Sequence, residues 1–426
     1  MKVIIVGAGI GGLAAGVGLR RQGHEVKIFE RSSLLREIGA AINICPNASR
    51  IVPQWGFDTR KARLVVARRH ILASGNSLES LHDVIYPDFQ GMYGGHWYLA
   101  HRVDLHSELR RINTSPEGLG QPVEISLRSE VVDYDVEDGS VTLADGSIHS
   151  ADLIVAADGV HSSAVERVIG HATPVIATGW AVFRFLIPTE DLRREPDIAP
   201  LLEEGATTLE DGLMKIFRTA DSMKRLVWYP CADNTIQNFV AVHEDRNTGD
   251  HEREDWNRSA DVEDVRSYFE DFHPHLMKIA SKATTINRWP LLYREPISTL
   301  TKGRLVLIGD AAHPMLPHQG QGGGQAIEDG AALSEIFANL PDNPSKEEIQ
   351  NRLKIFEKVR LRRVSAMQIL SNAGQDQAFR VRELAQQYLP EGVKFPETQE
   401  EFWDHNFGYD VLEDSRRHLK LYLDGK

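Results

Sequence analysis

The chain has 426 residues, of which 42% are hydrophobic and 26% charged, ordinary values for a globular protein of two or three structural units. Its net charge of -13 argues against nucleic acid and anionic membranes as partners, because both bind basic surfaces. The two cysteines, Cys45 and Cys231, lie far apart and lack metal-ligand spacing, so we expect no metal site and a reducing, cytoplasmic location.

The N-terminal stretch predicts a strand, a glycine-rich turn and a helix. An apolar strand at residues 2–6 runs into a GxGxxG pattern formed by Gly7, Gly9 and Gly12, and a helix follows to residue 22. In such a pattern Gly7 permits a tight turn, Gly9 lets the backbone approach a pyrophosphate, and Gly12 lets the helix pack on the strand. The glycines also argue against a signal peptide in the uncharged run 3–19, and no other run approaches transmembrane length.

Glu30 closes the second predicted strand, at residues 25–30, about where an acid that binds ribose is expected after the last glycine. Its carboxylate can accept hydrogen bonds from ribose hydroxyls and would repel the 2′-phosphate of NADP. The pattern therefore predicts FAD or NAD at this site, and the fingerprint alone does not separate the two.

The next hundred or so residues predict a small-residue loop, strands of a separate sheet and a helix. The loop is Glu37-Ile38-Gly39-Ala40-Ala41-Ile42, and a helix is expected at 48–55. Between 62 and 99, apolar runs alternate with turn signals, which predicts strands that leave the first domain. A helix then opens near Arg102 and runs to residue 112; an arginine in a first helical turn is by itself usually a solvated charge.

Three further strands are predicted at 123–127, 131–136 and 141–143, joined by hairpin turns into a small antiparallel meander. A strand near 152–155 leads to Asp158-Gly159 and a helix that Ser162 or Ser163 could cap.

Residues 179–287 contain strands rich in aromatic and β-branched side chains, which predict a mainly antiparallel second sheet. One face of this sheet could cover a flat aromatic ligand. Arg184 and Phe185 must lie on opposite faces, and alternation does not say which one faces the ligand. The alternatives are a buried ion pair for Arg184 and a core aromatic for Tyr229. Residues 289–291 are predicted to form a crossover back to the first domain.

The stretch from Gly309 to Asp329 follows an apolar strand at 304–308 and precedes a helix predicted at 326–340. Its glycines let backbone N–H groups approach a ligand, and Asp310 is placed to accept hydrogen bonds from a ligand hydroxyl. His313 and His318 are better read as packed or solvent-facing than as acid or base groups. Long helices are predicted at 346–389, and the aromatic stretch 402–423 should pack on the body.

Five motifs occur in the order of one known family: Gly7 to Gly12, Glu30, Arg102, Asp158-Gly159 and Gly309-Asp310 followed by Pro317 and Gly320-Gln321-Gly322. In this the chain resembles the class A, single-component FAD-dependent aromatic monooxygenases, and most closely the salicylate-hydroxylase-like members. The resemblance implies an α/β fold similar to para-hydroxybenzoate hydroxylase, with a Rossmann-type FAD-binding domain, an inserted antiparallel substrate domain and C-terminal helices.

The resemblance also assigns regions and site residues. It implies a discontinuous FAD-binding domain at 1–70, 100–175 and 288–345, a substrate domain at 71–99 and 176–287, and a C-terminal helical region at 346–426. The residues expected to bind FAD are Gly7, Gly9, Gly12, Glu30, Ala41, Arg102, Asp158, Asp310, Pro317, Gly322 and Gly323. The expected catalytic residues are Arg184, whose strand carries an arginine in some members, and Tyr229.

The implied reaction is hydroxylation of a small phenolic or aromatic-acid substrate by O2 through a flavin C4a-hydroperoxide, with NADH or NADPH docking transiently as reductant. The alternatives are another flavoprotein of this fold, such as a halogenase or an alkene reductase, and a catalytically silent FAD fold that binds a partner protein. Trp180-Ala181-Val182-Phe183 lacks the halogenase WxWxIP pattern, and intact loops at Gly39 and Gly320 weigh against a silent module.

Overall fold

The computed structural model describes residues 1–33, 40–203, 212–220, 222–246, 259–341, 343–390 and 392–425. The predicted loop at 37–42 is therefore described only from Ala40 onward. The helices are α1 (Ile10–Arg21), α2 (Pro46–Ser49), α3 (Phe89–Tyr93), α4 (Arg102–Thr114), α5 (Ala164–Ile169), α6 (Thr189–Arg193), α7 (Ala199–Glu203), α8 (Val262–Tyr268), α9 (Pro274–Ala280), α10 (Gly322–Ile336), α11 (Lys346–Leu370), α12 (Arg382–Gln386), α13 (Gln399–Phe407) and α14 (Val411–Asp424). Short 3-10 turns are η1 (Val52–Trp55), η2 (Gly309–Ala311), η3 (Pro317–Gln319) and η4 (Gln375–Val381).

The first sheet is the parallel layer that the N-terminal pattern predicts. Its order in the described residues is β18 (Thr301–Lys302), β19 (Leu305–Leu307), β11 (Leu153–Ala156), β1 (Lys2–Val6), β2 (Glu25–Glu30) and β7 (Glu124–Leu127). Every pair from β19 to β7 is parallel. The central strands are apolar and buried on both faces, as is typical of a parallel sheet covered by helices.

One predicted strand lies in a different sheet from the one expected. The strand at 124–127, β7, does not join the antiparallel meander; it pairs in parallel with β2, because α4 supplies the crossover that a parallel connection requires. The meander instead consists of β8 (Val131–Asp135), β9 (Ser140–Leu143) and β10 (Ile148–Ser150), the last of which the sequence analysis missed.

The second sheet is large and mainly antiparallel, as predicted. Its order in the described residues is β16 (Ser259–Ala260), β17 (Ile286–Tyr293), β12 (Ile176–Pro188), β15 (Ile236–Glu244), β14 (Arg225–Cys231), β13 (Gly212–Arg218), β4 (Val65–Ser74), β6 (Tyr98–His101) and β3 (Ala41–Ile44), with β5 (Ser80–Ile85) paired to β4. Strands from both halves of the chain therefore share one sheet, and the domain boundaries given above stay a prediction.

The predicted crossover at 289–291 is wrong, because these residues belong to strand β17. Pro290 lies opposite Ala181 of β12, where the register of β12 shifts. Within the described residues, β16 pairs with β17 at Ile286 and Asn287.

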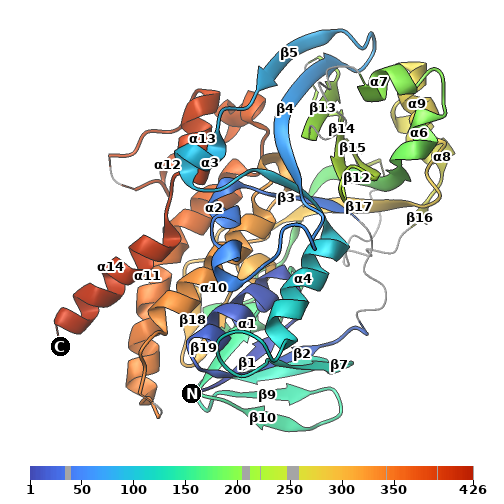
Figure 1. Ribbon diagram of the computed structural model, residues 1–426. Coiled ribbons are helices and arrows are strands. Elements are labelled where there is room, and N and C mark those ends of the chain that lie inside the picture. The colour runs from blue at the N-terminus through green and yellow to red at the C-terminus, as the bar shows by residue number, and fades with distance from the viewer. Residues whose placement is uncertain are drawn as a thin grey trace.

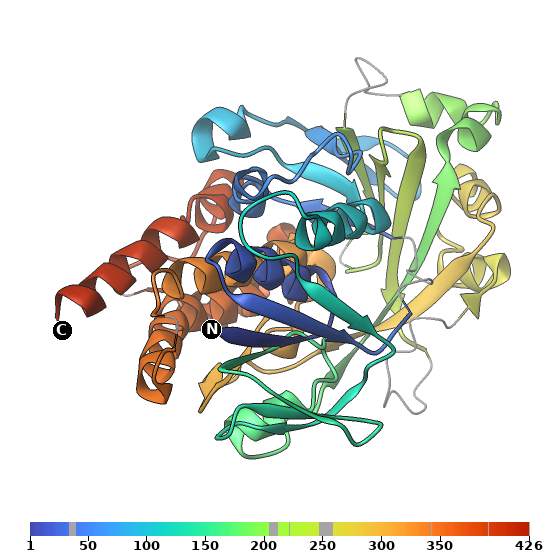
Figure 2. The same cartoon turned by 60° about the horizontal axis from the view of Figure 1, so that its bottom comes forward.

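The helices form the remaining layers (Figure 1). Helix α10 packs between α1 on one side and the C-terminal helices α11 and α14 on the other. In both Figure 1 and Figure 2, α11 and α14 lie on the opposite side of the molecule from strands β12 and β17 of the large sheet. Within the described residues, every helix is too short or too polar to cross a membrane. The α/β architecture with an inserted antiparallel sheet and C-terminal helices is confirmed.

Helix α10 begins four residues earlier than expected, inside the glycine run, at Gly322. Glycine is a poor helix former, so propensity alone places the start later. Tertiary packing overrides this, because a Cβ on Gly323 would come within 2.7 Å of Ile42 Cδ1. The glycines therefore form the first turn of the helix, which packs closely against β3.

Candidate active site

A cavity of about 1440 Å³ extends from the carboxyl ends of the parallel strands to one face of the large sheet. With one exception, every residue expected at the site lines it. These are Gly7, Gly9, Glu30, Ala41, Arg102, Asp158, Arg184, Tyr229, Asp310, Pro317, Gly322 and Gly323.

The exception is Gly12, which does not line the cavity and is a packing residue. A Cβ at this position would lie 2.0 Å from the carbonyl oxygen of Gly7, so glycine is needed for α1 to pack on the preceding turn. Gly7 itself has a φ of +99° and a Cβ there would meet the Ala157 carbonyl oxygen at 2.4 Å. Gly9 differs from both, because a Cβ on it would meet nothing within 4 Å. The open face of Gly9 forms the cradle expected for a pyrophosphate at a helix N-terminus.

Backbone hydrogen bonds hold the Glu30 carboxylate at the end of β2. Its Oε2 accepts from the Ala8 N–H at 2.7 Å, and its Oε1 accepts from the Ser32 N–H at 2.7 Å. Each oxygen keeps a further acceptor site, so the carboxylate can still receive ribose hydroxyls.

Two acidic residues of the central loops face the cavity in different ways. Asp158 Oδ2 accepts a 2.8 Å hydrogen bond from the Tyr134 hydroxyl, and burial raises the pKa of Asp158. Asp310 is exposed to the cavity space yet enclosed by protein, so burial raises its pKa while His313 and Arg102 oppose the rise. Asp310 is therefore placed to accept hydrogen bonds from a hydroxylated ligand chain.

Arg294 joins these two loops and was missed by the sequence analysis. Its guanidinium donates to the carbonyl oxygens of Val160 at 2.6 Å and Ala311 at 3.0 Å. The side chain is 4% exposed and follows directly after β17. Nothing in the local sequence marks it, because both acceptors are backbone groups distant in the chain.

The opposite side of the cavity is formed by β3 and the start of α10. The Ala41 N–H donates to Asn238 Oδ1 of β15 at 3.1 Å, which ties β3 to the large sheet. A Cβ on Gly320 would lie 3.2 Å from Asn43 Cβ, so the two segments approach closely only because residue 320 is glycine. Small residues thus leave room for a flat ring between backbone segments. The open cradle at Gly9, the carboxylate at Glu30 and this narrow slot together fit an extended dinucleotide with a planar ring, which is the shape of FAD.

Arg184 of β12 faces the cavity, whereas Phe185 faces the hydrophobic core on the other side of the large sheet. Strand alternation alone predicts opposite faces without saying which residue faces the cavity. Phe185 stacks on Phe239 with ring centroids 5.0 Å apart, away from the cavity. Arg184 Cζ lies 4.6 Å from the centroid of the Trp289 ring. Tyr229 also faces the cavity; burial raises its pKa, and the charge of Arg184 lowers it in part.

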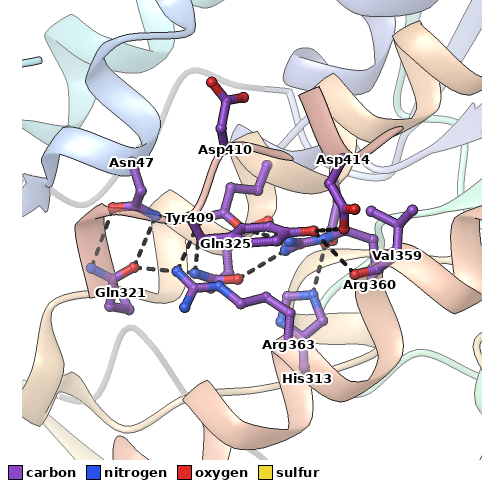
Figure 3. A network of polar contacts seen from close by, with 12 residues as sticks. Asn47, His313, Gln321, Gln325, Val359, Arg360, Arg363, Tyr409, Asp410 and Asp414 are labelled. Carbon is purple, nitrogen blue, oxygen red and sulfur yellow. Dashed lines mark hydrogen bonds and ion pairs between the residues drawn. The ribbon is translucent and has the colours of Figure 1, made fainter. Parts of the chain in front are cut away.

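Behind the cavity, a buried polar network connects α10 to the C-terminal helix α11 (Figure 3). Arg360 is fully buried and forms ion pairs with Glu328 and with Asp329, the latter at 2.8 Å. Asp329 Oδ2 in turn accepts from the Gly309 N–H at 2.9 Å and contacts His313 Nε2 at 2.7 Å. His313 is thus a packed residue, as expected, and the network fixes the loop that carries Asp310.

The same network reaches the start of α10. Asn47 Nδ2 donates to Gln321 Oε1 at 3.1 Å, and Gln325 Nε2 donates to the same oxygen at 3.2 Å. Gln325 also accepts from Arg360 at 2.8 Å. The sequence analysis missed this network, although two adjacent acids in the otherwise uncharged run 322–334 are a signal that buried cations must pair with them.

Comparison with known proteins agrees with this geometry. The family model described as "FAD binding domain" matches residues 123–368, and one described as "Pyridine nucleotide-disulphide oxidoreductase" matches residues 1–226. The chain is 40% identical to the FAD-dependent monooxygenase cfoG of Aspergillus candidus, over 99% of this chain and 96% of that protein. It is 33% identical to hispidin-3-hydroxylase of Neonothopanus nambi, over 99% and 97% of the two chains.

A solved structure gives the same result. A salicylate hydroxylase in complex with its substrate superposes with a TM-score of 0.72 at 25% identity, covering 98% of each chain. Together with the family match over more than half of the chain, these relatives decide the assignment. The chain belongs to the FAD-dependent monooxygenases of the class A aromatic hydroxylase type, and FAD is its cofactor.

Proposed function

We propose that this enzyme uses NADH or NADPH and O2 to hydroxylate a small phenolic or aromatic-acid substrate. The observation that supports this proposal most is that the dinucleotide cradle and the sheet face with Arg184 and Tyr229 line one cavity. Bound FAD would accept electrons from the nicotinamide and activate O2. The protein residues then have to bind, orient and polarise the aromatic ring.

Arg184 is the residue best placed to stabilise a substrate anion. An electron-rich phenolate is a better target for an electrophilic oxygen than a neutral phenol, so a fixed positive charge beside the phenolic oxygen lowers the barrier. The contact with Trp289 holds the guanidinium in place. Tyr229 has a raised pKa because it is buried, so its hydroxyl stays protonated and acts as a hydrogen-bond donor rather than as a base.

The proposal is tested with the purified, FAD-loaded protein. We expect phenols or benzoates to accelerate NAD(P)H oxidation, and isotopically labelled O2 to place one labelled oxygen atom in the product. A flavoprotein that only transfers hydride would oxidise NAD(P)H and yield an unlabelled product. A silent binding module would bind FAD without oxidising NAD(P)H in the presence of any ring compound.

A further inference from the structure

One straight row of side chains crosses the large sheet and forms the floor of the cavity. Direct strand pairing places these residues opposite one another, and all of them line the cavity: Arg184, Val240, Val227, Ile216, Leu72 and His82. The row makes five steps between neighbouring strands, so it is about 24 Å long. A single aromatic ring would cover roughly one or two of these steps, whereas two linked rings would cover three or four.

The row is polar at its two ends and apolar between them. Arg184 stands at one end, with Tyr229 nearby on β14, and His82 stands at the other end with His70 nearby on β4. The middle positions Val227, Ile216 and Leu72 carry no hydrogen-bonding side chain, and the neighbouring Met214 continues the apolar surface. Such a floor suits a ligand with a flat apolar body and polar groups at both ends.

His70 is the group able to recognise the far end of such a ligand. It lies opposite Met214 in the pairing of β13 with β4 and lines the cavity. Its Nδ1 is buried and has no hydrogen-bond partner among the residues that the structure describes. Burial lowers the pKa of His70 to about 4, so the ring is neutral at physiological pH, with one nitrogen that donates and one that accepts. Because the ring lines the cavity, a ligand hydroxyl could form a hydrogen bond with its accessible nitrogen.

The wall at this end of the cavity is aromatic. The rings of Tyr86 and Trp97 stack at 5.0 Å with an interplanar angle of 11°, and Trp403 of α13 meets Tyr86 edge-on at 6.0 Å. All three line the cavity. Trp97 Nε1 donates to Asn43 Oδ1 at 2.9 Å, so this aromatic wall is joined to the strand that borders the narrow slot. A second aromatic ring of the substrate would therefore extend from beside the slot along an aromatic surface.

We infer that the substrate is an elongated phenol of two linked aromatic rings, whose distal hydroxyl is bound by His70 while the proximal ring lies between Arg184 and Tyr229. This inference rests on the proposed hydroxylase function and adds the substrate class. His70 and Tyr229 stand on β4 and β14, two strands apart, which corresponds to about 10 Å and matches the separation of hydroxyl groups on two linked rings.

The test compares three probes on the FAD-loaded enzyme: a stilbene with a hydroxyl on each ring, the same stilbene without the distal hydroxyl, and phenol. Binding is measured by the perturbation of flavin absorbance and by quenching of tryptophan fluorescence, and turnover by product analysis. We expect the dihydroxylated stilbene to bind at least about tenfold more tightly than either other probe. Equal binding of phenol and the dihydroxylated stilbene would overturn the inference.

A His70→Leu variant should bring the binding ratio of the two stilbenes close to unity, and His70→Gln, which keeps a donor and an acceptor, should restore part of it. The matched control His171→Leu changes an exposed histidine outside the cavity and should keep the ratio of the native enzyme. An unchanged ratio in His70→Leu would refute the role of His70. Discriminating binding without any oxygenated product would instead refute the proposed function and leave the binding inference standing.

Discussion

Neighbouring glycines in the first turn have different physical roles, and substitution can separate them. Gly9 has a φ of -70°, which any residue can adopt, and its Cβ direction points into open space. We expect Gly9→Val to fold normally but to lose FAD affinity by at least about tenfold, because the side chain would fill the pyrophosphate cradle. Titration of the apoprotein with FAD measures this, and an unchanged dissociation constant would contradict it.

Gly12→Ala should instead destabilise the fold. Its Cβ would overlap the Gly7 carbonyl at 2.0 Å, so the helix must move, and we expect a loss of about 1–3 kcal/mol in the free energy of unfolding. Urea denaturation of the apoprotein separates this variant from Gly9→Val. Equal stability of Gly12→Ala and the native protein would show that the turn relaxes without cost.

Substitutions of Arg184 test its proposed role in hydroxylation. We expect Arg184→Ala to retain FAD while product formation falls by more than about a hundredfold, because the positive charge that we propose to lie beside the substrate oxygen is lost. The rate of product formation in Arg184→Lys should lie between that of the native enzyme and that of Arg184→Ala. Lysine keeps the positive charge but lacks the planar guanidinium group. Arg167→Ala removes an exposed arginine that pairs with Asp133 and serves as the control. Unchanged turnover in Arg184→Ala would remove this residue from the site.

At the scale of elements, helix α10 depends on Arg360 of α11. Removing this guanidinium leaves Glu328 and Asp329 as buried, poorly compensated carboxylates, both at most 1% exposed. We expect Arg360→Met to lower the free energy of unfolding by about 3–5 kcal/mol. FAD should also bind less tightly, because Asp329 holds the loop that carries Asp310. Urea unfolding and FAD titration measure the two effects.

The control for this prediction is an arginine that also pairs with α10. Arg416 of α14 pairs with Glu335 of α10 at 2.7 Å, but its side chain is 59% exposed. Solvent screens such a pair, so Arg416→Met should change stability by less than about 1 kcal/mol. Similar losses in the free energy of unfolding of both variants would show that burial of the Arg360 ion pairs does not account for the effect of Arg360→Met.

For the whole molecule, buried histidines predict a loss of stability in weak acid. Burial lowers the pKa values of His24 and His243 from 6.5 to about 4. Between these two pH values the unfolded chain binds protons that the folded chain does not, so the free energy of unfolding falls as the pH decreases from 6.5 toward 4. Urea denaturation of the apoprotein from about pH 7 to about pH 5 should show this decline.

One variant tests the origin of the decline. His24 Nε2 contacts the Phe337 carbonyl oxygen at 2.9 Å, and a glutamine amide can donate to the same acceptor. His24→Gln should therefore remain folded near neutral pH and lose less stability in weak acid than the native protein. A decline as steep as in the native protein would assign the effect to other groups.

Sequence alone was sufficient for the features that depend on local chemistry. A strand, a glycine turn, a helix and a terminal acid at Glu30 predict a dinucleotide site, because the turn conformation and the backbone approach are decided within a few residues. Alternating apolar residues likewise predict two-faced strands for the large sheet. The motifs shared with the family, Gly309-Asp310 above all, then favour FAD over NAD as the dinucleotide.

Tertiary structure alone decided which residues meet. Arg184 faces the cavity rather than the core because β12 pairs with β15 in one particular register, and a shift of one residue would exchange the two faces. Arg294, Asn238 and the Arg360 network act on partners far away in the chain, so no local pattern reveals them. The floor from Arg184 to His82 exists only after six strands have paired, since long-range packing fixes register and local sequence does not.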